Sequence, residues 1–351
     1  MSITKKPFGT TPAGEAVTEY TVTNASGASI SVCDFGGILT KIFMPDRDGR
    51  LDDINLGFDN VDVYASGKSG SMGMLIGRVG NRIKGGTFDL EGETYCLPKN
   101  SHGNCLHGGT KGFGMSMWQV KPDEANNALV LTLVSEDGDQ GFPGRLDVTV
   151  TYTLSESNEL GIHYQARTDK TTIVNMTNHA YFNLDGHAFG TVAEQELQIN
   201  ASLVTEVVEG LIPTGRLLPV EQVPYNFSAM TRIGDVLDKT AESPAMSMAG
   251  GVDFNYCAGR DRETKVIATL YSPRTGRTMD VITDQPGVQC YTGNGLNHEG
   301  KDGVHYGRYA GVCLETQHYQ DSIHQPHFPS IVLRPQDVYD TTTVYRFGVR
   351  G

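Results

Sequence analysis

The feature that most constrains the fold of this chain is a strand-like alternation of apolar and polar residues that recurs along most of its length. The alternating segments are short and rich in β-branched and aromatic residues, which is typical of strands that bury one face. Glycine, asparagine, aspartate or proline separates one segment from the next, and long amphipathic helical stretches are missing. We therefore expect strands at 19–24, 29–36, 39–45, 128–136 and 265–271.

Four short polar segments predict tight turns between consecutive strands, as in antiparallel hairpins. These turns lie at Asp48-Gly49, Glu91-Gly92, Ser155–Asn158 and Ser272–Gly276. The 42 glycines suit a chain with many such turns. The sequence thus predicts an all-β fold, one large antiparallel β-sandwich with few short helices.

A single domain over residues 1–351 is the simplest organisation of the chain. Its length allows one large core, and no fixed-period repeat, low-complexity tract or linker-like segment marks a boundary. The formal net charge of −13 disfavours a nucleic-acid partner or an anionic membrane. No segment approaches the ~18 consecutive apolar residues of a membrane span, and the first residues lack the apolar core of a signal peptide. We therefore expect a cytoplasmic protein.

Two segments place polar side chains where a strand would be apolar. In the segment 171–186, strand spacing puts on one face the side chains of Asn175, Thr177, His179 and Tyr181. In the segment 310–319, the like-facing side chains are Cys313, Glu315 and Gln317, and no lysine or arginine stands beside the carboxylate. A carboxylate and an imidazole are candidates for a general base and a general acid. His179 could equally be a hydrogen-bonded structural histidine, and Glu315 an exposed strand carboxylate.

A third candidate is the glycine-rich segment 100–109, which presents His102 and His107. Imidazoles on a loop are often positioned for binding or catalysis. The same segment could also be only a turn.

The histidines of the segment 313–330 do not predict a metal site. His318, His324 and His327 are spaced six and three residues apart, which matches no zinc signature. Pro326 breaks any helix that could align them. The six cysteines are scattered singly, which indicates reduced structural thiols. We expect a loop here and no bound metal.

Taken together, these segments resemble one family, the aldose 1-epimerases, also called galactose mutarotases. The resemblance covers nearly the whole chain in the order of the family, and the agreement of so many segments argues against chance. It is carried by segments that include "IGRVGNRIKGGTF", "NCLHGG", "MTNHAYFNL", "LIPTGRLLPV", "GGVDFNY", "PGVQCYTGN" and "CLETQHYQDSIHQPHFPSIVLRP".

The resemblance implies a β-sandwich isomerase that interconverts the α and β anomers of free aldoses such as galactose and glucose. It implies a monosaccharide substrate, no cofactor, and a monomer or homodimer. It gives Glu315 the role of general base and His179 that of general acid, and it places His107 near the ring oxygen of the sugar. Both His107 and His179 remain candidates for protonating that oxygen. The residues that the resemblance assigns to sugar binding are Asn81, Arg82, Tyr181, Asp253 and Gln289.

These residue types suit the reaction by themselves. To exchange anomers, the hydroxyl at C1 must lose a proton while the ring oxygen gains one, which a paired base and acid can do. No hydride or group is transferred, so no cofactor is needed. The chain departs from the commoner family pattern at Asn226, Val252, Phe254 and Gly295. Gly295 stands where phenylalanine is common, and we expect it to open an apolar wall of the pocket.

Two alternatives stay open. One is a catalytically idle sugar-binding or regulatory protein on the same fold, against which the retention of both Glu315 and His179 argues. The other is an epimerase of hexose 6-phosphates, whose pocket would need further basic side chains to meet a dianion. Near the matching segments the chain offers only Arg78, Arg82 and Lys84.

Overall fold

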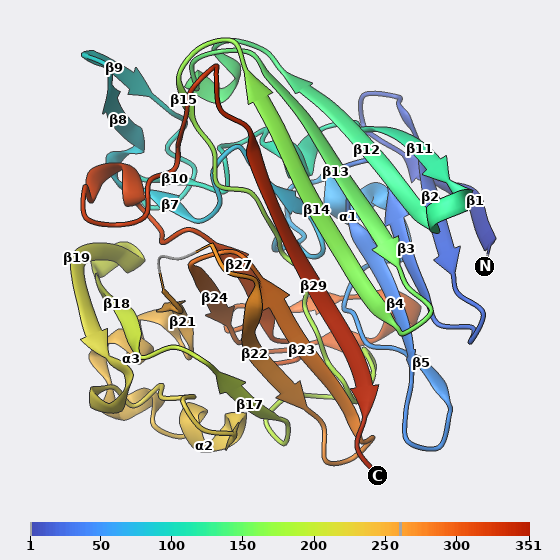
Figure 1. Ribbon diagram of the computed structural model, residues 1–351. Helices are drawn as coiled ribbons and strands as arrows, with labels where there is room; N and C mark the ends of the chain where they lie inside the picture. Colours follow the sequence, from blue (N-terminus) through green and yellow to red (C-terminus); the bar gives the residue numbers. More distant parts are fainter. Residues whose placement is uncertain (1, 260–261) are drawn as a thin grey trace.

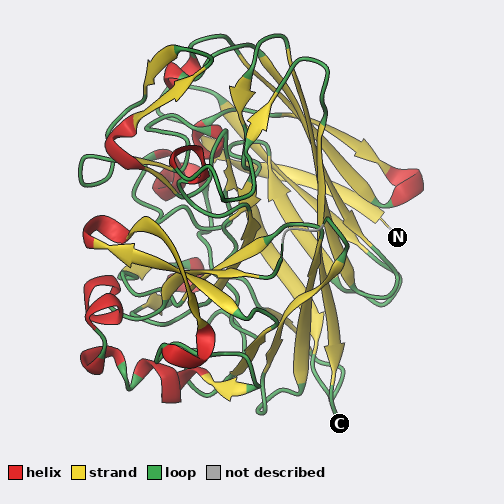
Figure 2. Cartoon of the chain, turned by 60° about the vertical axis from the view of Figure 1, so that its left-hand side comes forward, coloured by secondary structure: helices red, strands yellow, loops and turns green. Residues whose placement is uncertain are grey.

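The computed structural model describes residues 2–259 and 262–351, and strands predominate throughout them. The described part contains three short α-helices, which are α1 (Val61–Ala65), α2 (Ile233–Leu237) and α3 (Pro244–Ala249). The strands form the body of the molecule, and most of the helical segments lie on the left-hand side of the view in Figure 2. The prediction of an all-β fold with few short helices is confirmed. No helix within the described residues is long and apolar enough to cross a membrane.

The largest element of the fold is a nine-stranded antiparallel sheet. Its order is β11 (Gln119–Asp123), β12 (Ala128–Ser135), β13 (Leu146–Leu154), β14 (Glu159–Thr168), β29 (Tyr339–Val349), β23 (Arg277–Thr283), β22 (Lys265–Tyr271), β17 (Glu196–Ile199) and β20 (Thr231–Arg232). The C-terminal strand β29 joins the two halves, because it pairs with β14 on one side and β23 on the other. The two hairpins predicted here, β13–β14 and β22–β23, are confirmed.

Two five-stranded sheets pack against this large sheet. The first has the order β1 (Ser2–Thr10), β2 (Ala16–Thr23), β3 (Ser29–Cys33), β4 (Leu39–Pro45) and β5 (Leu51–Asp53). The second has the order β19 (Ile212–Pro219), β18 (Leu203–Val208), β21 (Asp253–Cys257), β24 (Gly287–Tyr291) and β27 (Cys313–Gln317). Figure 1 shows β13, β14 and β29 crossing the front, with β1–β5 behind them on the right and β18, β19 and β21 on the lower left.

One hydrophobic core joins the three sheets. It includes Ile42 from β4, Val148 from β13 and Leu314 from β27, all of them almost fully buried. Burying an aliphatic side chain of this size stabilises a fold by about 1.5–3 kcal/mol. Between the layers, the hydroxyl of Tyr345 donates a hydrogen bond to the carbonyl oxygen of Leu314 at 3.1 Å. This packing of sheet on sheet confirms the predicted sandwich.

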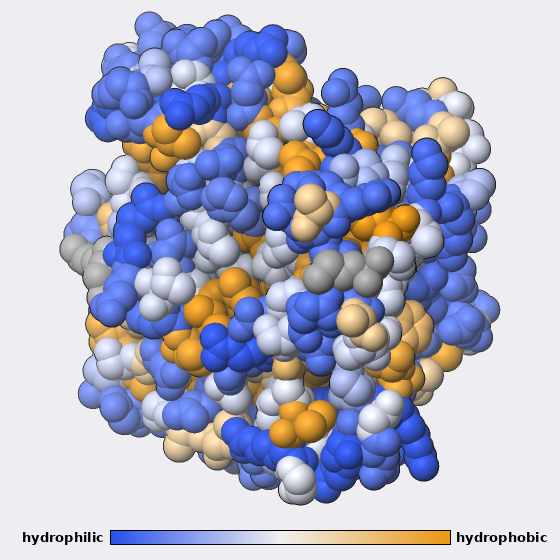
Figure 3. All heavy atoms as spheres, turned by 45° about the vertical axis from the view of Figure 1, so that its right-hand side comes forward, coloured by the Kyte–Doolittle hydropathy of each residue, from blue (hydrophilic) through white to orange (hydrophobic). Residues whose placement is uncertain are grey.

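Short strand pairs complete the fold, and several of them support the site. They are β6 (Leu75–Ile76) with β16 (Thr177–Asn178), β7 (Arg82–Ile83) with β10 (Cys105–Leu106), β8 (Thr87–Leu90) with β9 (Glu93–Cys96), β15 (Thr172–Ile173) with β28 (Val332–Leu333), and β25 (His298–Glu299) with β26 (His305–Tyr306). The β8–β9 hairpin turns at Glu91-Gly92 and β4–β5 at Asp48-Gly49, as predicted. On the face drawn in Figure 3, polar side chains predominate and the apolar ones form small separate groups.

Candidate active site

Three neighbouring strands of the second five-stranded sheet form the floor of the site. In β24 and β27, Gln289 lies directly opposite Glu315, and the next pair on that face is Tyr291 opposite Cys313. On the other side of β24, Asp253 of β21 lies opposite Tyr291. Residues directly opposite one another in a sheet share a face, so these side chains form a compact polar group. The alternate residues of the same strands point into the apolar core, which explains the alternation along the segment 310–319.

The chain segment after β16 carries the imidazole of His179 to this floor. The backbone of His179 is held from both sides, because its N–H donates to Met74 and its carbonyl oxygen accepts from Gly73, at 3.0 and 2.8 Å. Its Nε2 atom lies 3.7 Å from Oε1 of Glu315, and the two side chains are 7% and 2% exposed. The structure therefore brings together the two residues that the sequence places far apart.

The β7–β10 pair forms the opposite wall and supplies three of the candidate residues. In this pair Arg82 lies opposite Leu106, which sets His107 beside Asn81. The backbone N–H of Asn81 donates to Nδ1 of His107 at 3.2 Å, and the backbone N–H of His107 donates to the carbonyl oxygen of Asn81 at 3.0 Å. Because Nδ1 of His107 accepts a hydrogen bond, the proton of the neutral ring is on Nε2.

Burial changes the pKa values of groups in the floor and in the opposite wall. The pKa of Glu315 is raised well above its ordinary value, first by burial and then by the negative charge of Asp253, while Arg82 acts in the opposite direction. Burial lowers the pKa of His179 to about 4. The pKa of His107 is also lowered well below its usual range, by burial and by the charges of His179 and Arg82. A buried carboxylate with a raised pKa is a strong base, and a buried imidazolium with a lowered pKa is a strong acid.

The two carboxylates of the site, Glu315 and Asp253, also differ in their hydrogen bonds. The Oε2 atom of Glu315 is buried and has no hydrogen-bond donor within the described part of the chain. A carboxylate without protein donors is less stabilised in its charged form than one that accepts several. Burial raises the pKa of Asp253 as well, but the charge of Arg82 and a hydrogen bond of 2.6 Å from the amide of Gln289 act in the opposite direction. The two carboxylates thus have different environments, in which Glu315 is the better proton acceptor and Asp253 the better fixed anion.

Seven of the eight predicted site residues line one cavity of about 230 Å³. Gln289 is the exception, since it is only 1% exposed, and its amide donates to Asp253. Tyr181 lines the cavity, but its hydroxyl donates to the carbonyl oxygen of Gly70 at 2.9 Å and its ring stacks on His179. The complete set of lining residues is Gly70, Ser71, Asn81, Arg82, Leu106, His107, His179, Tyr181, Asp253, Tyr291 and Glu315.

Sequence reasoning missed four of these lining residues. Tyr291 had a readable signal, because it stands two residues beyond Gln289 on the same strand and therefore on the same face. Its ring packs edge to face against those of His179 and Tyr181. Gly70, Ser71 and Leu106 had none, since nothing local in their segments predicts which distant residues they will meet.

Several other candidate residues lie outside the cavity. His102 is exposed, and its backbone carbonyl accepts from the Asn104 side chain. Arg78 is buried elsewhere, where its guanidinium donates to the carbonyl oxygens of Pro143 and Gly144. Arg82 is the one basic side chain among the lining residues, apart from the histidines.

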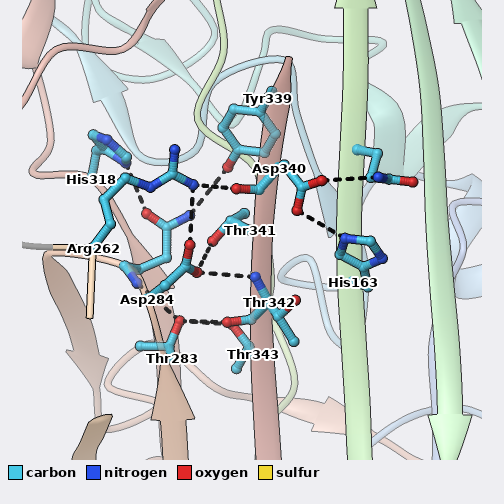
Figure 4. A network of polar contacts seen from close by, with 12 residues as sticks. His163, Arg262, Thr283, Asp284, His318, Tyr339, Asp340, Thr341, Thr342 and Thr343 are labelled. Atoms are coloured by element: carbon cyan, nitrogen blue, oxygen red, sulfur yellow. Dashed lines mark hydrogen bonds and ion pairs between the residues drawn. The ribbon is translucent and has the colours of Figure 1, made fainter. Parts of the chain in front are cut away.

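The three histidines of the segment 313–330 have separate partners. Nδ1 of His318 lies 2.8 Å from the side-chain oxygen of Gln285, in the polar network of Figure 4. His324 contacts Asp321 at 2.7 Å, and His327 contacts the backbone oxygen of Gly215 at 2.7 Å. The first residues of this segment form β27, and the rest is the expected loop with a short 3₁₀ turn at Ser322–His324.

None of the four residues that depart from the family pattern is among the lining residues of the cavity. Val252 and Phe254 belong to the hydrophobic core, and the ring of Phe254 stacks on Tyr225 with centroids 3.8 Å apart. Gly295 is exposed, and its backbone N–H donates to the hydroxyl of Tyr291 at 3.0 Å. A Cβ atom at Gly295 would lie 3.5 Å from that hydroxyl, which is ordinary van der Waals contact, so a side chain could start there without a clash.

Comparison with known proteins identifies the class to which this fold and site belong. The family model for aldose 1-epimerase matches residues 18–346. The chain is 38% identical to the galactose mutarotase of Bos taurus over 351 residues, 99% of each chain, and 33% identical to the aldose 1-epimerase of Escherichia coli K12 over 339 residues, 96% of each. A solved aldose epimerase homologue from C. elegans superposes with a TM-score of 0.86 at 30% identity, covering 94% of this chain and 98% of that one.

The class is that of the sugar epimerases, which are isomerases. Within it, the chain belongs to the aldose 1-epimerase family.

Proposed function

We propose that the protein interconverts the α and β anomers of free aldoses such as galactose and glucose, with Glu315 as general base and His179 as general acid. The observation that carries this proposal is the distance of 3.7 Å between Oε1 of Glu315 and Nε2 of His179 in the floor of one cavity. Two groups this close can reach the two oxygens that share C1 of a pyranose, the C1 hydroxyl and the ring oxygen.

The reaction needs two proton transfers in each direction. Glu315 takes the proton of the C1 hydroxyl, and Nε2 of His179 gives its proton to the ring oxygen as the bond between C1 and that oxygen breaks. The open aldehyde then rotates about the C1–C2 bond. On the opposite face, the hydroxyl at C5 attacks C1 while Glu315 returns its proton and His179 recovers its own. Base and acid of this kind each contribute on the order of 10²–10⁴-fold.

Burial drives both transfers in the forward direction. The form of the closed-ring complex that reacts has the pair as a carboxylate and an imidazolium, which is the minor tautomer of the neutral pair with the same shared proton. After ring opening the pair is a carboxylic acid and a neutral imidazole. Burial raises the pKa of Glu315 well above its ordinary value and lowers that of His179 to about 4. The neutral pair is therefore the one that the cavity favours, which lowers the free energy of the open-chain state relative to the same reaction in water.

His107 has a different role from His179 in this proposal. Protonation of His107 at Nδ1 would break the hydrogen bond from the backbone N–H of Asn81. Its low pKa, caused by burial and by neighbouring positive charge, opposes protonation as well. His107 therefore stays neutral and donates from Nε2 to a sugar oxygen, while His179 protonates the ring oxygen.

The remaining lining residues bind the sugar hydroxyls. Asp253 accepts from vicinal hydroxyls and Arg82 donates to them in a fixed fork. Asn81 supplies a neutral amide, and Gln289 orients Asp253 through its hydrogen bond of 2.6 Å. The ring of Tyr181 offers an apolar edge, since its hydroxyl is already bonded to Gly70.

The proposal includes the organisation of the protein. It is a single domain over residues 1–351, a monomer or homodimer, and a cytoplasmic enzyme that takes a small sugar and no nucleic acid. The core that joins all three sheets supports the single domain, because no part of the sandwich has a separate core of comparable size among the described residues. Light scattering of the purified protein measures the number of subunits.

Polarimetry of freshly dissolved α-D-glucose and α-D-galactose tests the activity. Purified protein should accelerate the approach to the equilibrium rotation of at least one of them, and Glu315→Gln should remove that acceleration. An unchanged spontaneous rate for every common aldose would contradict the proposal. Sugar binding by calorimetry without any acceleration would instead support an idle sugar-binding protein.

A further inference from the structure

We infer that Cys313 is a positioning residue that holds the imidazole of His179 by its Nδ1 atom, so that Nε2 is the nitrogen that exchanges a proton with the sugar. The Sγ atom of Cys313 lies 3.4 Å from Nδ1 of His179, within hydrogen-bond range for sulfur. Both side chains are buried. This inference rests on the proposed role of His179 as the acid.

The two nitrogens of His179 face different partners. Nδ1 faces the thiol, and Nε2 faces the cavity and the carboxylate of Glu315 at 3.7 Å. If the ring turned by half a revolution about its bond to Cβ, a carbon atom would replace each nitrogen, and no proton could reach the sugar. Stacking on Tyr181, with centroids 5.0 Å apart, fixes the plane of the ring but not which edge points outward. The contact between the thiol and Nδ1 determines which edge of the imidazole points into the cavity.

The reaction cycle determines the direction of this hydrogen bond. The imidazolium carries protons on both nitrogens, and after Nε2 has given its proton to the ring oxygen the neutral ring keeps the other on Nδ1. In both states the N–H at Nδ1 donates to the sulfur of Cys313. A thiol can accept in this way because it is a weak acceptor as well as a weak donor. Burial keeps the thiol protonated, since it raises the pKa of Cys313 well above its ordinary value.

A weak acceptor suits an acid that must release its other proton. A carboxylate at this position would stabilise the imidazolium and raise the pKa of His179, which would make it a weaker acid. The thiol orients the ring without such a charge, and the pKa of His179 stays low at about 4. The titratable and charged groups that face His179 from the surrounding elements are Glu315, Asp253, Arg82, His107, Tyr181, Tyr291 and Cys313.

Nitrogen-15 NMR of the histidine-labelled enzyme tests the inference with Cys313 left intact. At neutral pH, His179, assigned by its loss in His179→Asn, should show the neutral ring with the proton on Nδ1. His107 is the internal comparison and should show the proton on Nε2, because its Nδ1 accepts from the backbone of Asn81. A proton on Nε2 of neutral His179 would overturn the inference.

Three variants extend the test to turnover. Cys313→Ala should lower kcat about tenfold with little change in KM, which corresponds to ~1.4 kcal/mol. Cys313→Ser should restore most of the loss, because the hydroxyl also accepts a hydrogen bond. Cys290→Ala is the matched control, since Cys290 is a buried thiol on the neighbouring strand that faces the core. It should retain kcat even if its stability falls.

Equal kcat values for the wild type and Cys313→Ala would overturn the inference, and so would equal losses in Cys313→Ala and Cys290→Ala. Either result requires that the wild type be active. A wild type that accelerates no anomer exchange would instead refute the proposed function, so the two failures are distinguishable.

Discussion

Glu315→Gln should abolish most of the activity and at the same time stabilise the folded protein at neutral and alkaline pH. Glutamine has almost the same shape as glutamate but does not ionise. The Glu315 side chain is 2% exposed, and burial with the nearby charge of Asp253 raises its pKa well above the ordinary 4.5. The folded protein therefore resists the ionisation that the unfolded chain undergoes freely.

The sign and size of the stability change follow from this shift. Below about pH 4.5 the carboxyl group is protonated in both the folded and the unfolded state, and the substitution changes the free energy of unfolding little. Above that pH the unfolded chain releases the proton and the folded protein keeps it until the raised pKa is reached. In that window the wild type loses about 1.4 kcal/mol of stability per pH unit from this group, and the variant does not.

The assay measures two quantities on the same samples. Urea unfolding at several pH values gives the free energy of unfolding, and polarimetry of fresh α-D-galactose gives kcat. The turnover of Glu315→Gln should fall by a factor on the order of 10²–10⁴. Glu93→Gln is the matched control, because Glu93 is exposed on β9 and the same chemical change there should alter neither quantity.

Two outcomes would refute this reasoning. A stability difference between Glu315→Gln and wild type that stays constant from acid to alkaline pH would mean that the folded protein does not hold a raised carboxyl pKa there. Wild-type turnover in the variant would mean that another group is the base.

Three further predictions concern the walls of the cavity. His179→Asn should lower kcat nearly as much as loss of the base. His107→Asn should mainly raise the KM for galactose, because His107 binds the sugar as a neutral donor. Steady-state kinetics measures both parameters, and equal losses of kcat in the two variants would contradict the assignment. In the wild type, kcat measured by polarimetry should be flat through neutral pH. It should fall in acid near the His179 pKa of about 4, where the pair with Glu315 gains a second proton, and fall again in alkali, where the pair loses its shared proton; a maximum confined to acid would disagree. Tyr181→Phe should change KM by no more than about threefold, because the lost hydroxyl donates to Gly70 and not to the sugar. A far larger rise in KM would mean that this hydroxyl binds the substrate.

Part of the fold and of the site was open to prediction because it depends on local patterns. Alternation along the segment 310–319 separated the face of Cys313 and Glu315 from that of Leu314, and the structure has the same division. Turn residues predicted the hairpins, because glycine and asparagine favour the backbone angles that tight turns require. Resemblance to a family supplied the candidate residues that no local pattern singles out.

Other features depended on which strands become neighbours. The hydrogen bond from Gln289 to Asp253, for example, follows from the pairing of β21 with β24. The protonation site of His107 depends on a backbone N–H supplied by another segment.

The sequence alone predicted the all-β class, the hairpins and the candidate acid and base, because side-chain alternation and turn chemistry act over a few residues. Only the tertiary structure decided that Cys313 meets His179 across 134 residues of chain, and that the thiol and the carboxylate approach different edges of one imidazole. The physical reason is that a strand pattern specifies which face a side chain occupies, whereas the packing of sheets on one another specifies what that face meets.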